Sequence, residues 1–164
     1  MNTQQYQKIY DWFTARPRAL GALRLAAKGL PVVIAGSYGL MLAGILLAGH
    51  GPLFWRAVLV PGVTFVAGTA LRDGLNRPRP YEKGIVALLP KDTKGKSFPS
   101  RHSLAAGVLS ATWLAVCPPV GAVMTVLALG VCISRVLAGV HAPVDVAVGF
   151  LLGYASGLVG MLVL

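Results

Sequence analysis

The chain is poor in charged residues, and poorest in acidic ones. Charged residues make up only 12% of its 164 positions and hydrophobic residues 55%, which is too apolar for an ordinary water-soluble domain of this size. The five acidic residues include no pair whose spacing suggests a magnesium site, so the sequence predicts no metal. The two cysteines, Cys117 and Cys132, lie in apolar stretches, which favours core packing and implies no disulfide framework.

The basic residues are abundant, at fifteen Lys and Arg, and give a formal net charge of +10. In a soluble protein this excess would indicate nucleic-acid binding. Here the basic residues flank long apolar runs, and no aromatic platform alternates with them as nucleic-acid binding would require. The expected partner is therefore a lipid bilayer with anionic headgroups, and not a nucleic acid.

Long apolar runs predict an all-α fold, a polytopic membrane bundle of about five spans. A helix needs about 20 apolar residues to cross the hydrocarbon core. The expected spans are residues 30–49, 53–71, 102–117, 120–137 and 144–164. Residues 1–28 mix basic and apolar side chains, so they are expected to form an interfacial amphipathic helix before a transmembrane domain of residues 29–164.

Two polar clusters lie beside the spans, where ionisable groups are costly and therefore indicate function. Residues 72–80 contain Arg72 and two Arg-Pro pairs, whose prolines favour an extended chain. Residues 98–103 contain Ser100 as the expected N-cap of the third span, next to Arg101 and His102. The positive end of that helix would attract an anion. The alternative for residues 72–80 is a basic flank of a span, and the alternative for residues 98–103 is an ordinary helix start.

A third cluster comprises Ser134-Arg135, His141 and Asp145. Pro143 suits the first turn of the last span, which places His141 in the preceding loop and Asp145 in that turn. A carboxylate there can accept one imidazole N–H and leave the other ring nitrogen free as a nucleophile. The alternative is a structural ion pair between Arg135 and Asp145.

The order of the spans brings all three clusters to one membrane face. Arginines, a helix N-terminus and two histidines at one place fit phosphoryl transfer, in which charge neutralisation and positioning carry most of the catalysis. By parity, the same face holds fourteen of the fifteen basic residues, and Arg56 lies opposite. The positive-inside rule therefore favours a cytoplasmic site in the cell membrane.

These motifs resemble the type 2 phosphatidic acid phosphatase (PAP2) superfamily. Its pattern is Lys, six residues, Arg-Pro, then Pro-Ser-Gly-His, then Ser-Arg, five residues, His, three residues, Asp. This chain has Arg72 and Arg79-Pro80, then residues 99–102, then Ser134-Arg135, His141 and Asp145. Two departures are Arg72 in place of Lys, which exchanges a point charge for a planar fork, and Arg101 in place of Gly.

The resemblance implies a role for each matching residue. His141 would attack phosphorus to form a phosphohistidine and would be oriented by Asp145, while His102 would act as general acid and then activate water. The phosphate would be held by Arg72, Arg79, Ser100 and Arg135, with Arg101 adding a contact or narrowing access. No cofactor is implied.

The resemblance leaves the substrate and the oligomeric state open. Phosphatidate, phosphatidylglycerophosphate and undecaprenyl diphosphate each offer a phosphate to such a site. One alternative function is a non-catalytic lipid-phosphate-binding or transport protein, although binding alone would need only the arginines. Another is a vanadate haloperoxidase, but those enzymes are soluble, and the expected spans argue against it.

Overall fold

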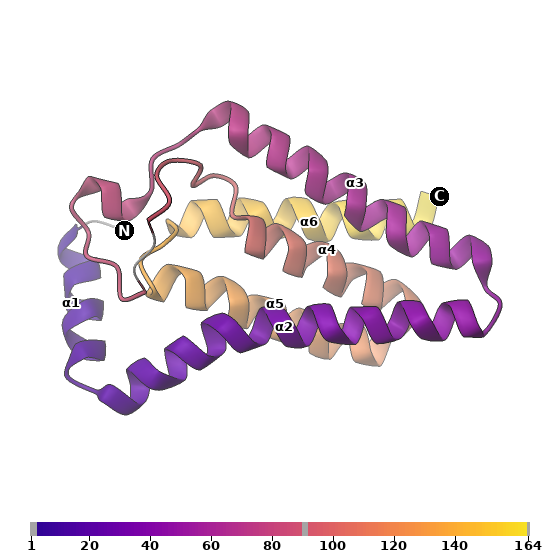
Figure 1. Ribbon diagram of the computed structural model, residues 1–164, viewed down its shortest axis with the longest axis horizontal. Coiled ribbons are helices and arrows are strands. Elements are labelled where there is room, and N and C mark those ends of the chain that lie inside the picture. The colour runs from indigo at the N-terminus through magenta and orange to yellow at the C-terminus, as the bar shows by residue number, and fades with distance from the viewer. Residues whose placement is uncertain (1–2, 90–91, 164) are drawn as a thin grey trace.

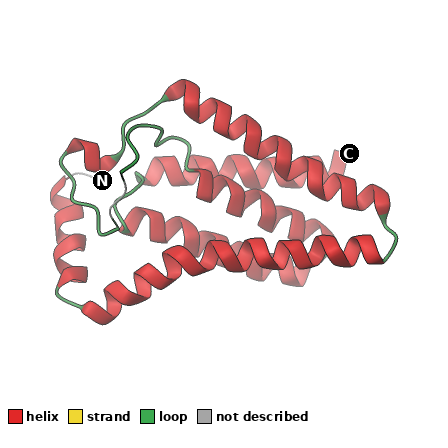
Figure 2. Ribbon diagram, in the orientation of Figure 1, coloured by secondary structure: helices red, strands yellow, loops and turns green. Residues whose placement is uncertain are grey.

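The computed structural model describes residues 3–89 and 92–163, and every regular element there is a helix (Figures 1 and 2). Lys91, one of the basic residues counted above, lies outside the described residues. The elements are α1 (Thr3–Thr14), α2 (Pro17–Leu47), α3 (Gly51–Leu75), the short 3₁₀ helix η1 (Pro80–Lys83), α4 (Arg101–Val116), α5 (Pro118–Leu137) and α6 (Pro143–Val163). The all-helical membrane fold is thus confirmed.

The N-terminal segment is organised differently from the prediction. The expected boundary at residue 28 lies inside α2, a continuous helix of 31 residues, and the chain breaks instead at residues 15–16. Pro17 causes this break, since it keeps Arg16 out of the helical conformation and itself suits a first helical turn. At about 46 Å, α2 is longer than the hydrocarbon core of about 30 Å, so its two ends cannot both lie in hydrocarbon.

Four of the predicted spans are helices long and apolar enough to cross a membrane, and the fifth is shorter. The four contain α2, α3, α5 and α6. Helix α4 has 16 residues, about 24 Å, and contacts each of those four helices. Half of its residues are buried, most of them small, which suits a helix surrounded by others. The chain therefore builds its bundle around α4.

Glycines bring α6 against α4. A Cβ built at Gly149 would lie 2.7 Å from the carbonyl oxygen of Ser100, and one at Gly153 would lie 2.1 Å from that of Leu104. Both distances are shorter than real Cβ contacts, so only glycine permits this approach. The backbone N–H of Ser100 also donates to the Asp145 carbonyl oxygen over 2.9 Å. The first turns of α4 and α6 are therefore fixed side by side.

The polar segments gather at one end of the bundle. Helix α1, η1, the loop between η1 and α4, and the α5–α6 turn lie at the left of Figure 1, and the α2–α3 turn lies at the right. Arg56 donates to the Met161 carbonyl oxygen near the C-terminal end of α6, away from the other basic residues. The structure thus brings the three polar clusters to the same end, as the order of the spans predicts.

Candidate active site

Two arginines of the first cluster are buried where α3 ends. Arg72 lies in the last turn of α3 and donates to the Pro99 carbonyl oxygen over 3.4 Å. Arg79 follows in extended conformation and donates to the carbonyl oxygens of Gly95 and Val140 over 3.0 and 3.4 Å. Both are 3% exposed, and these hydrogen bonds go to neutral carbonyl groups. Buried positive charge with neutral partners favours an anion.

Glu82 folds the following loop back onto Arg79. One carboxylate oxygen of Glu82 accepts the backbone N–H of Arg79 and that of Gly95, each over 2.8 Å. Further along, the backbone N–H of Ser97 donates to the Arg77 carbonyl oxygen over 2.8 Å. The first cluster and the segment before α4 therefore form one unit, which brings Ser97 to the site.

The second cluster starts α4 as predicted, but its serine acts differently. Ser100 is the N-cap residue, and its side chain makes no capping hydrogen bond. Its hydroxyl oxygen instead accepts a hydrogen bond from Ser103 over 3.1 Å. Arg101 is exposed in the first turn and His102 is half-buried beside it. Because the first backbone N–H groups of a helix lack partners within it, this end can receive an anion.

Two members of the third cluster, His141 and Asp145, have the predicted arrangement, with the Ser97 hydroxyl added between them. His141 is buried in the turn before α6 and Asp145 is buried in the first turn of that helix. Nδ1 of His141 lies 3.9 Å from Oδ2 of Asp145, beyond hydrogen-bond distance. Ser97 donates to that Oδ2 over 2.5 Å, and its Oγ lies 3.4 Å from Nδ1. The direct contact expected from the sequence is therefore replaced by a serine bridge.

The ion-pair partner of Asp145 is Arg77, so the predicted alternative of an Arg135–Asp145 pair is wrong. Nη1 of Arg77 lies 3.2 Å from Oδ1 of Asp145, while Oδ2 accepts Ser97 and the Ala142 backbone N–H over 3.0 Å. Both carboxylate oxygens are therefore occupied. The Arg-Pro repeat points to Arg77, whereas Ser97 stands in a loop that carries no distinguishing sequence signal.

Arg135 lies in the last turn of α5 and is hydrogen-bonded to the backbone of α2. Its Nη2 donates to the Ala27 carbonyl oxygen of α2 over 2.6 Å, because α2 packs alongside α5. Its Nε is buried without a hydrogen-bond partner among the described residues. The structure therefore directs Arg135 toward α2, and Asp145 pairs with Arg77 instead.

Burial lowers the pKa of His141 below its ordinary value, and the charges of Arg79 and Arg72 lower it further. Asp145 acts in the opposite direction and limits the shift. The imidazole is consequently neutral at physiological pH. With its proton donated to Asp145, the Ser97 oxygen can accept Nδ1–H, which leaves the Nε2 lone pair free.

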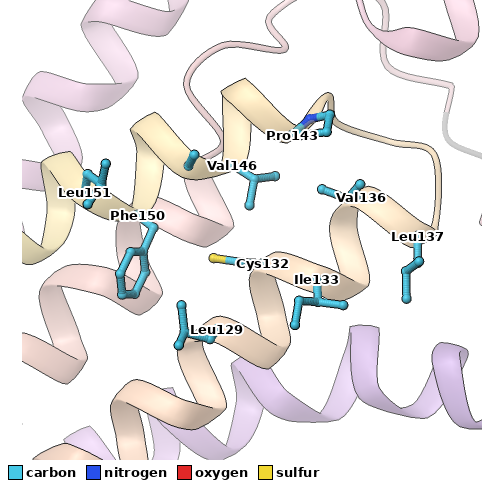
Figure 3. Close-up of a pocket in the computed structure, with 10 residues that line it drawn as sticks. Leu129, Cys132, Ile133, Val136, Leu137, Pro143, Val146, Phe150 and Leu151 are labelled. Atoms are coloured by element: carbon cyan, nitrogen blue, oxygen red, sulfur yellow. The ribbon is translucent and has the colours of Figure 1, made fainter. Parts of the chain in front are cut away.

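A groove of about 540 Å³ lies between α5 and α6 and is lined by apolar side chains (Figure 3). Leu129, Ile133 and Val136 line it from α5, and Val146, Phe150 and Leu151 from α6. Pro143, two residues after His141, also lines it. Hydrocarbon-compatible surface thus begins close to the site.

Comparisons with known proteins agree with this architecture. The chain superposes on the crystal structure of LpxE from Aquifex aeolicus with a TM-score of 0.62 and 25% identity, over 87% of this chain and 93% of the other. It also superposes on the crystal structure of a transmembrane PAP2 type phosphatidylglycerolphosphate phosphatase from Bacillus subtilis. That match has a TM-score of 0.54 and 26% identity, over 96% of this chain and 90% of the other.

No curated protein matches the chain in a direct sequence comparison. The family model of the PAP2 superfamily matches residues 53–164, about two thirds of the chain, and this range includes all three polar clusters. The chain belongs to the PAP2 superfamily.

Proposed function

We propose that the protein is an integral-membrane lipid phosphate phosphatase that works through a phosphohistidine on His141. The observation that carries this proposal is the buried His141–Ser97–Asp145 unit beside the buried Arg72 and Arg79, at one end of an apolar bundle. Binding alone would not require an oriented, neutral imidazole. The similar Bacillus subtilis structure is itself named as a phosphatase of a lipid phosphate, which supports the same reaction class here.

In the first step, Nε2 of His141 attacks phosphorus. A P–N bond forms, the P–O bond to the leaving group breaks, and His102 donates a proton to the departing oxygen. Nδ1–H faces Ser97 and Asp145, so the positive charge that develops on the imidazole lies near a carboxylate.

In the second step, His102 takes a proton from water as the water oxygen attacks the phosphohistidine. The P–N bond breaks, inorganic phosphate leaves, and His141 returns to its neutral form. The same histidine therefore serves as acid in one step and as base in the other.

The phosphate would be held by Arg72, Arg79, Arg101 and Ser100. Arg135 would also bind it after its side chain rotates from the Ala27 carbonyl oxygen toward the site. Arginines would neutralise the equatorial oxygens in both transition states. Asp145 already accepts hydrogen bonds on both oxygens, so it is engaged in orienting His141. We therefore expect turnover without a metal ion.

The substrate is proposed to be a lipid because the site adjoins spans and an apolar groove. Phosphatidate, phosphatidylglycerophosphate and undecaprenyl diphosphate remain the candidate classes. A panel of these three, assayed with purified protein in lipid, would rank them by kcat/KM.

The test of the function is phosphate release from this panel in the presence of EDTA. Wild-type protein should release phosphate, and His141→Ala should lose essentially all turnover while still binding substrate. His50→Ala is the matched control, because His50 is exposed at the α2–α3 turn, far along the chain from the site. Activity lost in EDTA and restored by magnesium would overturn the metal-free mechanism, and an active His141→Ala would overturn the nucleophile.

A further inference from the structure

The three arginines of residues 72–80 differ in their surroundings. Arg72 and Arg79 are each 3% exposed, and they donate to neutral carbonyl oxygens. The Arg77 side chain is 44% exposed, and its Nη1 lies 3.2 Å from Oδ1 of Asp145. Because this carboxylate already balances the charge of Arg77, Arg77 is less suited than the other two arginines to hold a phosphate. Its position indicates a role toward Asp145 instead.

Arg77 supplies the charged partner of a buried carboxylate. The Asp145 side chain is 2% exposed, so water is largely excluded from it. Oδ2 accepts hydrogen bonds from the Ser97 hydroxyl and the Ala142 backbone N–H, and Oδ1 accepts one from Arg77. Hydrogen bonds on both oxygens fix the rotation of the carboxylate, and the one from a cation is the strongest type. Loss of Arg77 would leave Oδ1 without its charged partner.

Arg77 also holds the segment that carries Ser97. The Arg77 carbonyl oxygen accepts the backbone N–H of Ser97 over 2.8 Å. The guanidinium carbon of Arg77 lies 5.8 Å from the ring centroid of Phe98, within the range of a cation–π contact. Ser97 is the residue whose hydroxyl lies between Asp145 and His141. One arginine therefore contacts the carboxylate and the two residues that lead into α4.

The charge of Arg77 opposes that of Asp145 close to the imidazole of His141. The charged groups that act on His141 are Asp145, which raises its pKa, and Arg79 and Arg72, which lower it. A carboxylate paired with a cation stabilises an imidazolium less than an unpaired carboxylate does. With Arg77 in place, His141 can therefore be neutral before the reaction, while Asp145 still lies beside it when positive charge develops.

We propose that Arg77 is a positioning residue, which holds Asp145 in the orientation that serves His141 and limits the negative charge that the imidazole experiences. This inference rests on the proposed function. Arg77 acts through Asp145, whereas Arg72 and Arg79 act on the phosphate. The Arg-Pro repeat thus contains two arginines with different tasks, one for the nucleophile and one for the substrate.

The experiment compares Arg77→Gln with the control Lys96→Gln. Lys96 pairs with Asp73 over 3.1 Å and its side chain is 48% exposed, so the control removes an equal charge from an ion pair of similar exposure. Arg77→Lys tests rescue, because a single nitrogen of Arg77 contacts Oδ1. The kinetic constants kcat and KM are measured against pH, and thermal unfolding in detergent reports whether each variant folds.

Nuclear magnetic resonance of protein labelled with ¹⁵N at histidine measures the pKa of His141 without turnover. The chain has three histidines, and the His141 signal is the one absent from His141→Ala. This titration separates the two proposals. Absence of phosphatase activity in the wild-type protein would overturn the proposed function, while the titration would still show whether Arg77 acts on His141 through Asp145.

In Arg77→Gln, the pKa of His141 should rise by about 0.5 to 1 pH unit, because the charge of Asp145 is no longer opposed. The acidic limb of kcat/KM should move upward with it, which is the direction opposite to that expected for Asp145→Asn. We expect kcat to fall about tenfold with KM nearly unchanged, since the orientation of Asp145 is lost and the phosphate site is kept. Arg77→Lys should restore most of kcat, and Lys96→Gln should match the wild type.

The double variant Arg77→Gln/Asp145→Asn tests whether Arg77 acts through Asp145. Its kcat should differ from that of Asp145→Asn less than about twofold, since the partner of Arg77 is already neutral. This comparison serves even where Arg77→Gln alone does not fold. A further tenfold loss in the double variant would overturn the proposal, as would an unchanged pKa of His141 in folded Arg77→Gln. A rise in KM with an unmoved acidic limb would instead assign Arg77 to the substrate.

Discussion

The hydroxyl group of Ser97 lies between the two side chains that carry the proposed chemistry. It donates to Oδ2 of Asp145, and its oxygen lies 3.4 Å from Nδ1 of His141. This arrangement selects the tautomer with hydrogen on Nδ1 without a direct His–Asp hydrogen bond. Because Ser97 is fully buried, water cannot replace its hydroxyl without rearrangement.

Replacement of Ser97 by alanine should lower kcat about tenfold to a hundredfold, or about 1.4 to 2.7 kcal/mol of barrier, and should leave KM nearly unchanged. The nucleophile would remain, but its tautomer and orientation would no longer be fixed. Single-turnover kinetics on the preferred lipid phosphate measure this effect. Ser37→Ala, which removes a hydroxyl in the middle of α2, is the control and should keep wild-type kcat. A large rise in KM with normal kcat would argue that Ser97 contacts substrate instead.

The pH dependence of kcat/KM should show an acidic limb below the ordinary histidine pKa of 6.5, because burial lowers the pKa of His141. The rate falls as pH drops through that pKa, since protonation removes the nucleophilic lone pair. Asp145 raises the pKa of His141, so Asp145→Asn should move the limb to still lower pH while reducing kcat. A limb that moves upward in this variant would contradict the assigned pairing.

Sequence spacing predicts the site residues where the relation is local. Pro143, His141 and Asp145 occupy the expected turn and helix start, and Ser100 is the expected N-cap. The direction of Arg135 depends instead on a helix more than one hundred residues away in sequence. Such packing leaves no trace in local spacing, so neither the direction of Arg135 nor the bridging position of Ser97 could be predicted.

At the scale of elements, contacts of α4 position the site. The first turns of α4 and α6 are joined by Ser100 and Asp145, and glycines of α6 let the two helices touch. The sequence shows small residues in both helices, but not which pair of helices they join. The length of α4 was predicted closely, whereas its central place in the bundle follows only from the packing.

Substitution of Gly153 by alanine should destabilise the fold by about 1 to 3 kcal/mol, because the new Cβ would meet the Leu104 backbone at 2.1 Å. The matched control is Gly44→Ala, since a Cβ at Gly44 meets nothing within 4 Å. Thermal unfolding of both variants in detergent gives the comparison. Equal melting temperatures would show that α4 and α6 are not in close contact.

Helix α1 is attached to the same end of the bundle through Tyr6. Its hydroxyl donates to the Leu137 carbonyl oxygen over 3.3 Å and accepts the Leu88 backbone N–H over 3.4 Å. Gly139 has a φ of +74°, and a Cβ built there would lie 2.1 Å from the Tyr6 hydroxyl oxygen, so the glycine leaves room for the Tyr6 side chain. The amphipathic pattern of residues 1–28 indicates a helix at the membrane surface, but it does not reveal this anchor or the break before Pro17.

For the whole molecule, the charge distribution favours a site on the cytoplasmic face. The structure places α1 and the loop before α4 at the site end, so the basic residues of both segments lie on one side of the bundle. Arg56 lies toward the other end. We propose on this basis that the substrate is taken from the inner leaflet.

Single cysteines in a variant without Cys117 and Cys132 test this orientation. Lys94→Cys, in the exposed loop before α4, should react with a membrane-impermeant maleimide only after cell lysis. His50→Cys, exposed at the α2–α3 turn, is the matched control and should react in intact cells. The opposite pattern would place the site on the outer face and favour undecaprenyl diphosphate as substrate.

The central claim is that His141 becomes covalently phosphorylated, and mass spectrometry of the trapped intermediate tests it most directly. In His102→Ala, a phosphate ester with a leaving group that needs no protonation should still phosphorylate His141, while hydrolysis of the intermediate is slowed. The account predicts an acid-labile phosphoryl group on His141 that is absent from His141→Ala. Turnover without any such group, or a phosphoryl group on another residue, would contradict it.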